Sequence, residues 1–369
     1  MVTLMSSFID FHILQLVPPS CINRDDTGSP KSARFGGVER HRVSSQAWKR
    51  AIRNDFAAHL NSEELGERTK YVVAKVAEKL VEIRSDISSE DALKHATAVL
   101  KAADIKVDDK RPEQTAYLLF LSPQEVQNFA EAAARSADGE KLGKKAAREL
   151  LMGDGVIDVA LFGRMLADAR ELNVDAACQV QHSLSVHKAI PEFDYYTAID
   201  DNAPEDNAGA SMIGTTEFVS STLYRYATIN VDKLAANLGS KEAAARAVEA
   251  FARSFVLSMP TGKQNSFANR TRPDFVLVEV RSDQPTSLVN AFEEPVANNG
   301  TALRDAAIAL ANHAVDEDKQ YGTAPTISSY LATERVNSEA LKDALAGRSE
   351  LSDLQGIIDR IGAVVRDTQ

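Results

Sequence analysis

The fold is decided by the stretch from Cys21 to Arg53, which reads CINRDDTGSPKSARFGGVERHRVSSQAWKRAIR. Its first part is rich in Asn, Asp, Gly, Ser and Pro, which favour turns, so it predicts a loop. Its last part predicts a helix start, because Ser44 or Ser45 can cap the first turn. Apolar residues then recur at helical spacing and define a face that must pack against a core. These residues are Trp48, Ala51, Ile52, Phe56 and Leu60.

The same stretch is positively charged, although the whole chain has a formal net charge of −11. Gln46, Lys49 and Arg53 are three and four residues apart, so they share one flank of the predicted helix. Backbone amides beside Gly36 and Gly37, with the positive end of a helix dipole, suit phosphate groups. A solvated basic face beside a core helix is the alternative. The upstream basic residues are Arg24, Lys31, Arg34, Arg40, His41 and Arg42.

Length and composition restrict the class of protein. The 369 residues predict two or three domain-sized units. No apolar run is long enough to cross a bilayer, the N-terminus lacks the order of a signal peptide, and Cys21 and Cys178 match no zinc motif. We therefore expect a cytoplasmic protein that does not bind membranes. The acidic balance argues against general nucleic-acid binding, so any RNA binding should be local.

Strands and helices follow a recognisable order once two insertions are set aside. Alternating apolar residues predict strands at 8–17, 180–187, 218–230 and 275–280, and helical spacing predicts helices near 45–60 and 240–259. The order strand, helix, strand, strand, helix, strand is that of the split βαβ, or ferredoxin-like, plan of RNA-recognition domains. The expected fold class is therefore α+β.

The remaining segments are expected to be insertions and a C-terminal extension. Residues 61–177 have helical spacing and a strong helix start at Ser122-Pro123-Gln124-Glu125. Residues 189–216 are polar, acidic and loop-like, and the chain after about Gly300 predicts several short helices. The expected divisions are 1–60, 61–177, 178–188, 189–216 and 217–369.

Neither candidate central strand contains the basic and aromatic run with which RNA-recognition domains stack bases. Base stacking across the sheet is therefore not expected. Contacts to the RNA backbone become the expected mode of binding, and such contacts carry no sequence information.

The stretch that ends at Arg53 resembles the start of the CasC-type backbone subunit of Cascade, the type I-E CRISPR surveillance complex. The matching pieces are SC-x-NRDD, FGG, R-x-SSQ and KRA-x-R. The resemblance runs from about residue 8 to about residue 295. Shorter pieces that also fit are GRM at Gly163–Met165, Y-T-A-x-DD ending at Asp201, G-T-x-EF ending at Phe218, YRYA-x-IN ending at Asn230 and NAFE at Asn290–Glu293.

The resemblance implies a hand-like subunit. The palm, of RNA-recognition type, would comprise 1–60, 178–188 and 217–369, with C-terminal helices in the last part. Residues 61–177 would form helical fingers, and 189–216 a thumb loop. Several copies would polymerise along CRISPR RNA beside other Cascade subunits and present its bases for pairing with target DNA. The resemblance implies no catalysis, no metal and no cofactor.

Particular residues are expected to contact RNA. In the thumb, Tyr195, Tyr196 and Thr197 are candidates for displacing a base, because aromatic rings stack without sequence preference. The alternative for both tyrosines is that they anchor the thumb to the body. The residues expected to grip the RNA backbone are Arg24, Lys31, Ser44, Gln46, Lys49 and Arg53. The resemblance implies that Met165 and Lys263 also contact the RNA.

Other arrangements of polar residues leave alternatives open. Asp25 and Asp26 are turn residues, but adjacent carboxylates can hold Mg²⁺ beside phosphate, and related type III backbone subunits cleave RNA with a loop aspartate. An RNA-cleaving subunit is therefore one alternative, and a scaffold that contacts only proteins is another. His12 and His182 fall within predicted strands and are expected in the core, whereas His187 could be exposed.

Overall fold

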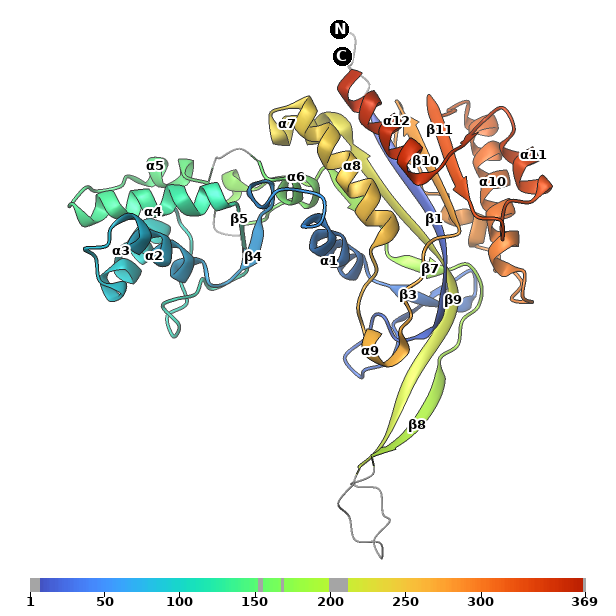
Figure 1. Cartoon of the computed structure of the whole chain (residues 1–369), viewed down its shortest axis with the longest axis horizontal. Helices are drawn as coiled ribbons and strands as arrows, with labels where there is room; N and C mark the ends of the chain where they lie inside the picture. The colour runs from blue at the N-terminus through green and yellow to red at the C-terminus, as the bar shows by residue number, and fades with distance from the viewer. Residues whose placement is uncertain (1–6, 152–154, 167–168, 199–211, 368–369) are drawn as a thin grey trace, which may run out of the picture. The chain divides into compact units, whose positions relative to one another are not determined.

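The computed structural model describes residues 7–151, 155–166, 169–198 and 212–367 (Figure 1). The chain divides into two compact units. The first, here the sheet unit, comprises Met1–Asp55, Val180–Thr228 and Phe251–Gly362. The second, here the helical unit, comprises Phe56–Gln179, Ile229–Ala250 and Ala363–Gln369. Among the described helices, none is both long enough and apolar enough to span a bilayer.

A large mixed sheet organises the sheet unit. Eight of its strands follow the order β12-β11-β10-β1-β9-β7-β3-β2, and β8 pairs with β9 beside this path. The pair β11 and β12 is parallel, whereas β1 and β10 are antiparallel. The eight strands of this path and β8 are β1 (Phe8–Ser20), β2 (Ser32–Phe35), β3 (Val38–Val43), β7 (Ser183–Ser185), β8 (Glu192–Ala198), β9 (Met212–Asn230), β10 (Phe275–Arg281), β11 (Ile327–Ala332) and β12 (Glu350–Leu351).

The four strands predicted from the sequence, here β1, β7, β9 and β10, are contiguous in the sheet in the order β10-β1-β9-β7. Helix α1 (Ser45–Phe56) lies between β1 and β7 in the chain, and α8 (Lys241–Leu257) lies between β9 and β10. The predicted α+β class is confirmed by this mixture of a large sheet and helices.

One face of the sheet packs against α8. Odd-numbered residues of β1 point to this side because successive side chains on a strand alternate between faces. The ring of Phe11 lies 5.5 Å from that of Phe251 and 6.2 Å from that of Phe255, both in edge contact. Helix α12 (Leu354–Asp367) also reaches α8, through a hydrogen bond from Arg253 to Gln355. Helix α8 therefore covers this face at β1.

The opposite face is closed by C-terminal elements. Helix α10 (Ala302–Tyr321) and the 3₁₀ turn η3 (Leu288–Phe292) pack on it, followed by α11 (Glu339–Leu345). Leu14, Tyr224 and Leu277 from the strands share one buried cluster with Leu303 and Leu310 of α10. An RNA-recognition domain stacks bases on an open sheet face. Since both faces of the central strands β1, β9 and β10 are covered, these strands offer no surface for base stacking.

Arg225 of β9 joins four elements in the core. Its side chain is fully buried, and its guanidinium lies 3.8 Å from the ring centre of Trp48 in α1 and 4.7 Å from that of Phe255 in α8. It donates to Gln15 Oε1 of β1 at 2.6 Å and to the carbonyl of Phe255. Burial lowers its pKa to about 9, so it remains charged at neutral pH. Trp48 is a core residue, as predicted.

His12 is also a core residue, as predicted. It lies on the other side of β1, where its Nδ1 is 2.9 Å from the hydroxyl of Tyr224 and its Nε2 is 3.9 Å from Glu279. Burial lowers its pKa to about 4, so the ring is neutral at pH 7. Glu279 is balanced by Arg281 at 2.9 Å and by Arg348. This network lies beneath the C-terminal elements and has a structural role in the core.

The basic stretch is partly a hairpin rather than a loop. Strands β2 and β3 pair antiparallel across a turn at Gly36-Gly37, with Ser32 opposite His41 and Phe35 opposite Val38. The sequence predicted a loop here because the residues before Pro30 favour turns. The C-terminal part also differs from the expected run of short helices, because β11 extends the sheet beside β10.

The predicted thumb loop contains a two-stranded arm. Strand β8 pairs with the first part of β9 from Glu192↔Phe218 to Ala198↔Met212, and the two strands leave the sheet together (Figure 1). Three aromatic residues and the β-branched Thr197 in Phe193-Asp194-Tyr195-Tyr196-Thr197 favour this strand. The acidic residues Asp200, Asp201, Glu205 and Asp206 lie outside the described residues.

The helical unit has its own apolar core, in which Val76, Leu80, Leu100 and Phe129 are buried. The predicted capping box is confirmed: Ser122 Oγ accepts from Glu125 N at 2.9 Å, and Glu125 accepts from Ser122 N at 2.8 Å. The elements of this unit are α2 (Val72–Ile83), α3 (Ser89–Ala102), α4 (Pro123–Ala137), α5 (Lys144–Glu149), α6 (Ile157–Phe162), α7 (Val231–Leu238), the strand pair β4 (Glu67–Thr69) and β5 (Leu119–Leu121), and the 3₁₀ turns η1 (Ser62–Glu64) and η2 (Arg170–Leu172).

Replacing Arg225 with lysine should lower the free energy of unfolding by about 3 kcal/mol. A lysine ammonium cannot lie flat on Trp48 while donating to both Gln15 and Phe255, so buried polar groups lose partners. Urea unfolding followed by fluorescence measures the change. Arg50→Lys, at an exposed position of α1, is the control and should change stability by less than about 0.5 kcal/mol. Equal effects of the two substitutions would contradict the role given to Arg225.

Candidate nucleic-acid interface

A groove of about 850 Å³ lies in the sheet unit, where three segments of chain meet. They are the loop after β1, the start of α1, and the loop after α8. Four predicted RNA-binding residues, Arg24, Ser44, Gln46 and Lys263, line it together, although the last is far from the others in sequence. Other lining residues are Ile22, Asn23, Asp25, Asp26, Thr27, Gly28, Ala47, Arg50, Ala51, Asn54, Met259, Pro260, Thr261 and Gly262.

Asn23 fixes the first segment against the second. Its side-chain Oδ1 accepts from the backbone N–H of Ser44 at 2.8 Å, at the start of α1. Its own carbonyl accepts from Lys31 N at 3.0 Å, which closes the loop that carries Arg24. Ser44 is buried, and its Oγ accepts from Ala47 N at 3.3 Å. Ser44 therefore holds the first turn of the helix as a cap, whereas Arg24 is exposed.

Helix α1 presents a different face to the groove from the one predicted. Gln46, Arg50 and Asn54 line the groove at successive helical turns. Lys49 and Arg53 are half-buried and are not among its lining residues. Sequence reasoning missed Arg50, although its spacing of four residues from Gln46 places it on the same face.

The third segment approaches the first very closely at Gly262. A Cβ atom there would lie 2.4 Å from the carbonyl oxygen of Ile22, so only glycine fits. Lys263 follows with φ +46°, an uncommon conformation for a residue with a side chain, and its Nζ donates to Thr216 Oγ1 at 3.1 Å. The short helix α9 (Gln264–Phe267) begins directly after it. The backbone thus directs Lys263 toward the groove and the base of the arm.

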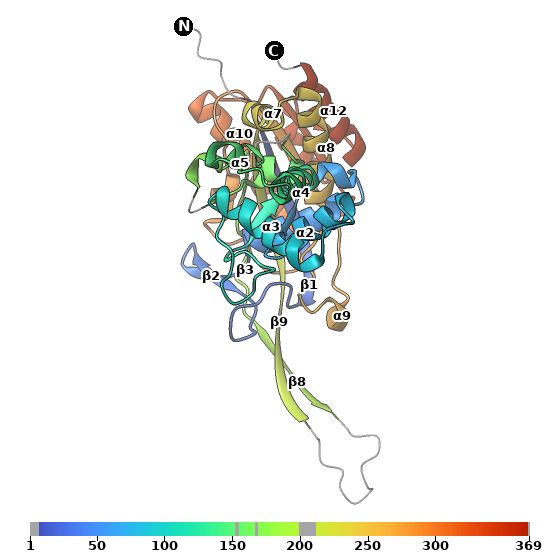
Figure 2. The same cartoon turned by 90° about the vertical axis from the view of Figure 1, so that its left-hand side faces the viewer.

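The groove and the arm are connected at two points. Besides the bond from Lys263 to Thr216, Ser29 Oγ donates to Glu217 Oε1 at 2.8 Å. Thr216 and Glu217 belong to β9 near the base of the arm. The hairpin β2–β3 and α9 both lie at the end of the sheet from which the arm projects (Figure 2). The loops that form the groove therefore also hold the arm.

The arm exposes one apolar face. Phe193 is 70% exposed and Tyr195 is 64% exposed, and their alternation along β8 places them on the same side. Thr197, also on that side, is exposed and lies opposite Ile213, which is 63% exposed. Tyr196 lies on the other side against Gly214, where an added Cβ would come within 2.5 Å of its ring. Tyr195 is thus available for contact, and Phe193 is a second candidate that the sequence analysis missed.

The two adjacent aspartates differ in their surroundings. Asp25 Oδ1 accepts from Thr27 Oγ1 at 2.7 Å, Thr27 N at 2.9 Å and Ser29 N at 3.0 Å. The hydrogen bond from the Thr27 side chain is the main cause of the lowered pKa of Asp25. Asp25 therefore shapes the loop, whereas Asp26 is exposed beside it in the groove. No group of three His, Cys, Asp or Glu side chains suited to a metal occurs among the described residues.

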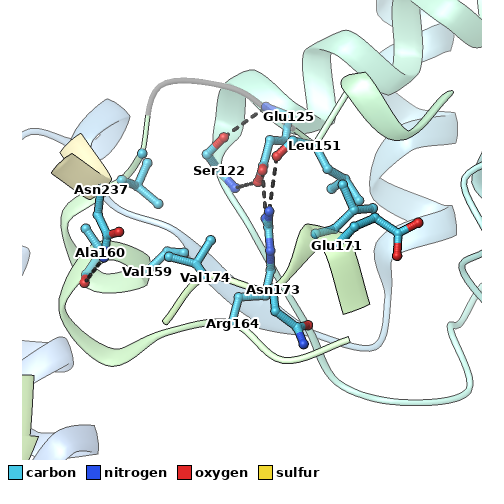
Figure 3. A pocket seen from close by; sticks show the side chains of 13 residues that line it. Ser122, Glu125, Leu151, Val159, Ala160, Arg164, Glu171, Asn173, Val174 and Asn237 are labelled. Carbon is cyan, nitrogen blue, oxygen red and sulfur yellow. Dashed lines mark hydrogen bonds and ion pairs between the residues drawn. The ribbon is translucent and has the colours of Figure 1, made fainter. Parts of the chain in front are cut away.

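Met165 belongs to the helical unit, unlike the other predicted RNA-binding residues. It follows Arg164, which is buried and pairs with Glu125 at 2.7 Å and with the carbonyl of Leu151 at 3.1 Å beside a cavity of about 280 Å³ (Figure 3). Gly163 has φ +79° and lies tightly against Val174. The backbone thus turns sharply at Gly163, and the buried side chain of Arg164 holds the segment in place. The next side chain, Met165, is 82% exposed.

Two histidines lie where they were not expected. His182 is exposed because β7 begins only at Ser183, so the predicted alternation from 180 to 187 is not one continuous strand. His187 is buried, and its Nε2 accepts from Thr222 N at 3.1 Å. Burial lowers the pKa of His187, which keeps it neutral. The expectation of a core His182 and an exposed His187 was therefore wrong.

Gly262→Ala should separate the loop after α8 from Ile22 and lower stability by about 1–2 kcal/mol, because backbone atoms must move. Hydrogen–deuterium exchange should show faster exchange at residues 259–263, since the contact that orders them is lost. Gly143→Ala is the matched control, because an added Cβ there has no atom within 4 Å. Identical exchange in both variants would show that the close approach at Gly262 does not order this loop.

Comparison with known proteins places the chain in a family. A solved chain described as part of a "CRISPR RNA-guided surveillance complex, pre-nicking" shares 32% identity at a TM-score of 0.82, covering 97% of this chain and 100% of that one. Another, from a "CRISPR RNA-guided surveillance complex", shares 28% identity at a TM-score of 0.65, covering 97% and 99%. No curated protein matches. The model of the CT1975-like protein family matches residues 9–357, and the chain belongs to that family.

Proposed function

We propose that this chain is a CRISPR RNA-binding backbone subunit of a Cascade-type surveillance complex, of the CasC kind. The observation that carries the proposal is the convergence of Arg24, Arg50 and Lys263 on one groove in a chain of net charge −11. The similarity to chains of RNA-guided surveillance complexes supports it. The strand order β10-β1-β9-β7 also fits a ferredoxin-like palm, with the helical unit as fingers and the arm as thumb.

The groove would bind the RNA backbone and not its bases. The guanidinium groups of Arg24 and Arg50 and the ammonium of Lys263 suit phosphates, and Gln46 supplies a neutral donor. Such contacts do not depend on sequence, which a protein that must hold any guide requires. Base pairing between guide and target DNA would then read the sequence, as in other RNA-guided effectors. No catalytic step is needed for this role.

The arm would act between neighbouring copies along the guide. Its exposed face with Phe193 and Tyr195 suits stacking against a base that is turned out of the strand. A two-stranded hairpin is marginally stable by itself, so contact with RNA or with the next copy would also stabilise it. Met165, exposed on the helical unit, is a further contact for the guide. The complex would act in the cytoplasm beside other Cascade subunits.

Arg24→Ala and Arg50→Ala should each weaken binding to single-stranded RNA of every sequence. Each should reduce the slope of log affinity against log salt by about 0.7, the value for one phosphate contact on a single strand. Fluorescence anisotropy with two unrelated RNA sequences, at several salt concentrations, measures both effects. Arg304→Ala, an exposed arginine elsewhere in the sheet unit, is the control. A changed preference between the sequences, or an equal effect of Arg304→Ala, would contradict backbone binding.

A metal-dependent RNA-cleaving subunit is a second candidate, because Asp26 is exposed in the same groove. We expect no cleavage when the assembled complex is incubated with complementary RNA and Mg²⁺ and the products are separated on a gel. Cleavage that Asp26→Asn abolishes, and that the control Asp316→Asn leaves intact, would favour the second candidate. An assembly purified without nucleic acid would instead favour a scaffold that contacts only proteins.

A further inference from the structure

A second group of basic side chains lies outside the groove, in β3 and directly before β2 and β7. It consists of Lys31, Arg42 and His182, here called the hairpin cluster. Arg42 Nη1 lies 3.1 Å from His182 Nδ1, and Arg42 Nε donates to the carbonyl of Ser32 at 3.1 Å. Two hydrogen bonds therefore hold the guanidinium in one orientation. Its Nη2 has no hydrogen-bond partner among the described residues.

The charges in this cluster repel one another. Arg42 N donates to the carbonyl of Lys31 at 2.8 Å, which makes the two residues cross-strand neighbours. Like charges opposite each other on paired strands lower stability. Neither side chain forms an ion pair with a carboxylate in the described parts of the chain. Glu39, also in β3, lies on the other face of the hairpin, because it is separated from Arg42 by three positions.

His182 can orient Arg42 because its ring is neutral. The ring is exposed overall, but its partial desolvation is the largest cause of its lowered pKa, and the charges of Arg42 and Lys31 lower that pKa further. A neutral ring offers Nδ1 as an acceptor to the guanidinium. The ring therefore holds the arginine without neutralising it. The cluster keeps two positive charges and one free terminal nitrogen available to an anion.

The hairpin cluster is continuous with the groove. Lys31 N donates to the carbonyl of Asn23 at 3.0 Å, and Asn23 lines the groove and holds the start of α1. Backbone hydrogen bonds thus connect Asn23, which lines the groove, to Lys31 and Lys31 to Arg42. This connection distinguishes the cluster from an isolated basic patch.

We propose that Lys31, Arg42 and His182 form a second phosphate-binding site, which takes a phosphodiester of the single-stranded RNA that occupies the groove. The inference rests on the proposed function and extends it to residues outside the groove. Arg42 contacts the phosphate together with Lys31. His182 is a positioning residue that acts through Arg42.

The test measures binding of single-stranded RNA by the full-length chain over a range of salt concentrations. Arg42→Ala should weaken binding about three- to tenfold at moderate salt and reduce the salt slope by about 0.7. Arg34→Ala is the matched control, since Arg34 is an exposed cation of the same hairpin on its other face. It should leave the slope unchanged. Arg42→Gln, which retains a donor for His182 and Ser32, separates loss of charge from local unfolding and should reproduce the effect of alanine.

His182 is tested by rescue. His182→Ala should weaken binding less than Arg42→Ala and leave the salt slope nearly unchanged, because no charge is removed. His182→Gln should restore affinity, because the amide oxygen can accept from Arg42. If His182→Ala has no effect, or if glutamine fails to rescue it, the positioning role is wrong.

The outcomes also separate this inference from the proposed function. If Arg42→Ala and Arg42→Gln behave like Arg34→Ala while Arg24→Ala and Arg50→Ala still weaken binding, the second site is wrong and the groove stands. If none of the groove or cluster variants changes the salt dependence, the proposed function itself fails, and this inference with it.

Discussion

The position of helix α1 depends on one buried cation. The guanidinium of Arg225 lies between Trp48 and Phe255 and donates to Gln15 and to a carbonyl of α8. None of these partners is a carboxylate, so the charge is stabilised by aromatic faces and by polar oxygens that must remain in place. A shift of α1 would remove Trp48 from the guanidinium of Arg225. Because α1 carries Gln46 and Arg50, the same contact fixes one wall of the groove.

The covered sheet explains where a ligand can bind. On the central strands, the face that contacts α8 and the face that contacts α10 are both buried, so these strands offer no open platform for bases. Polar residues that could contact a strand of RNA are gathered in loops at one end, around Asn23 and Gly262. Loops held by a rigid scaffold can place charges accurately while leaving the bases outside. The proposed indifference to guide sequence follows from this arrangement.

Sequence reasoning succeeded where the signal is local. Helix α1, the core position of Trp48 and the capping box at Ser122 depend on residues within a few turns of one another, and the structure has all three. The hairpin β2–β3 and the exposed position of His182 depend on which strands pair with each other. The spacing of apolar residues within one segment does not predict that pairing. Whether Lys49 or Arg50 lines the groove depends on which face of α1 is turned toward it, and the basic residues alone do not show that. The approach of Gly262 to Ile22 joins segments that are distant in sequence, so no local pattern could predict it.

The sheet ends in very short strands. Strand β12 has two residues and β2 has four, and they form the two edges of the strand path. Long free edges invite another chain to add a strand and start uncontrolled aggregation. The proposed assembly of several copies along one guide would bring such edges close together, which would make this hazard larger. At these two ends of the strand path, the short edges leave little free backbone to which a neighbouring copy could add a strand.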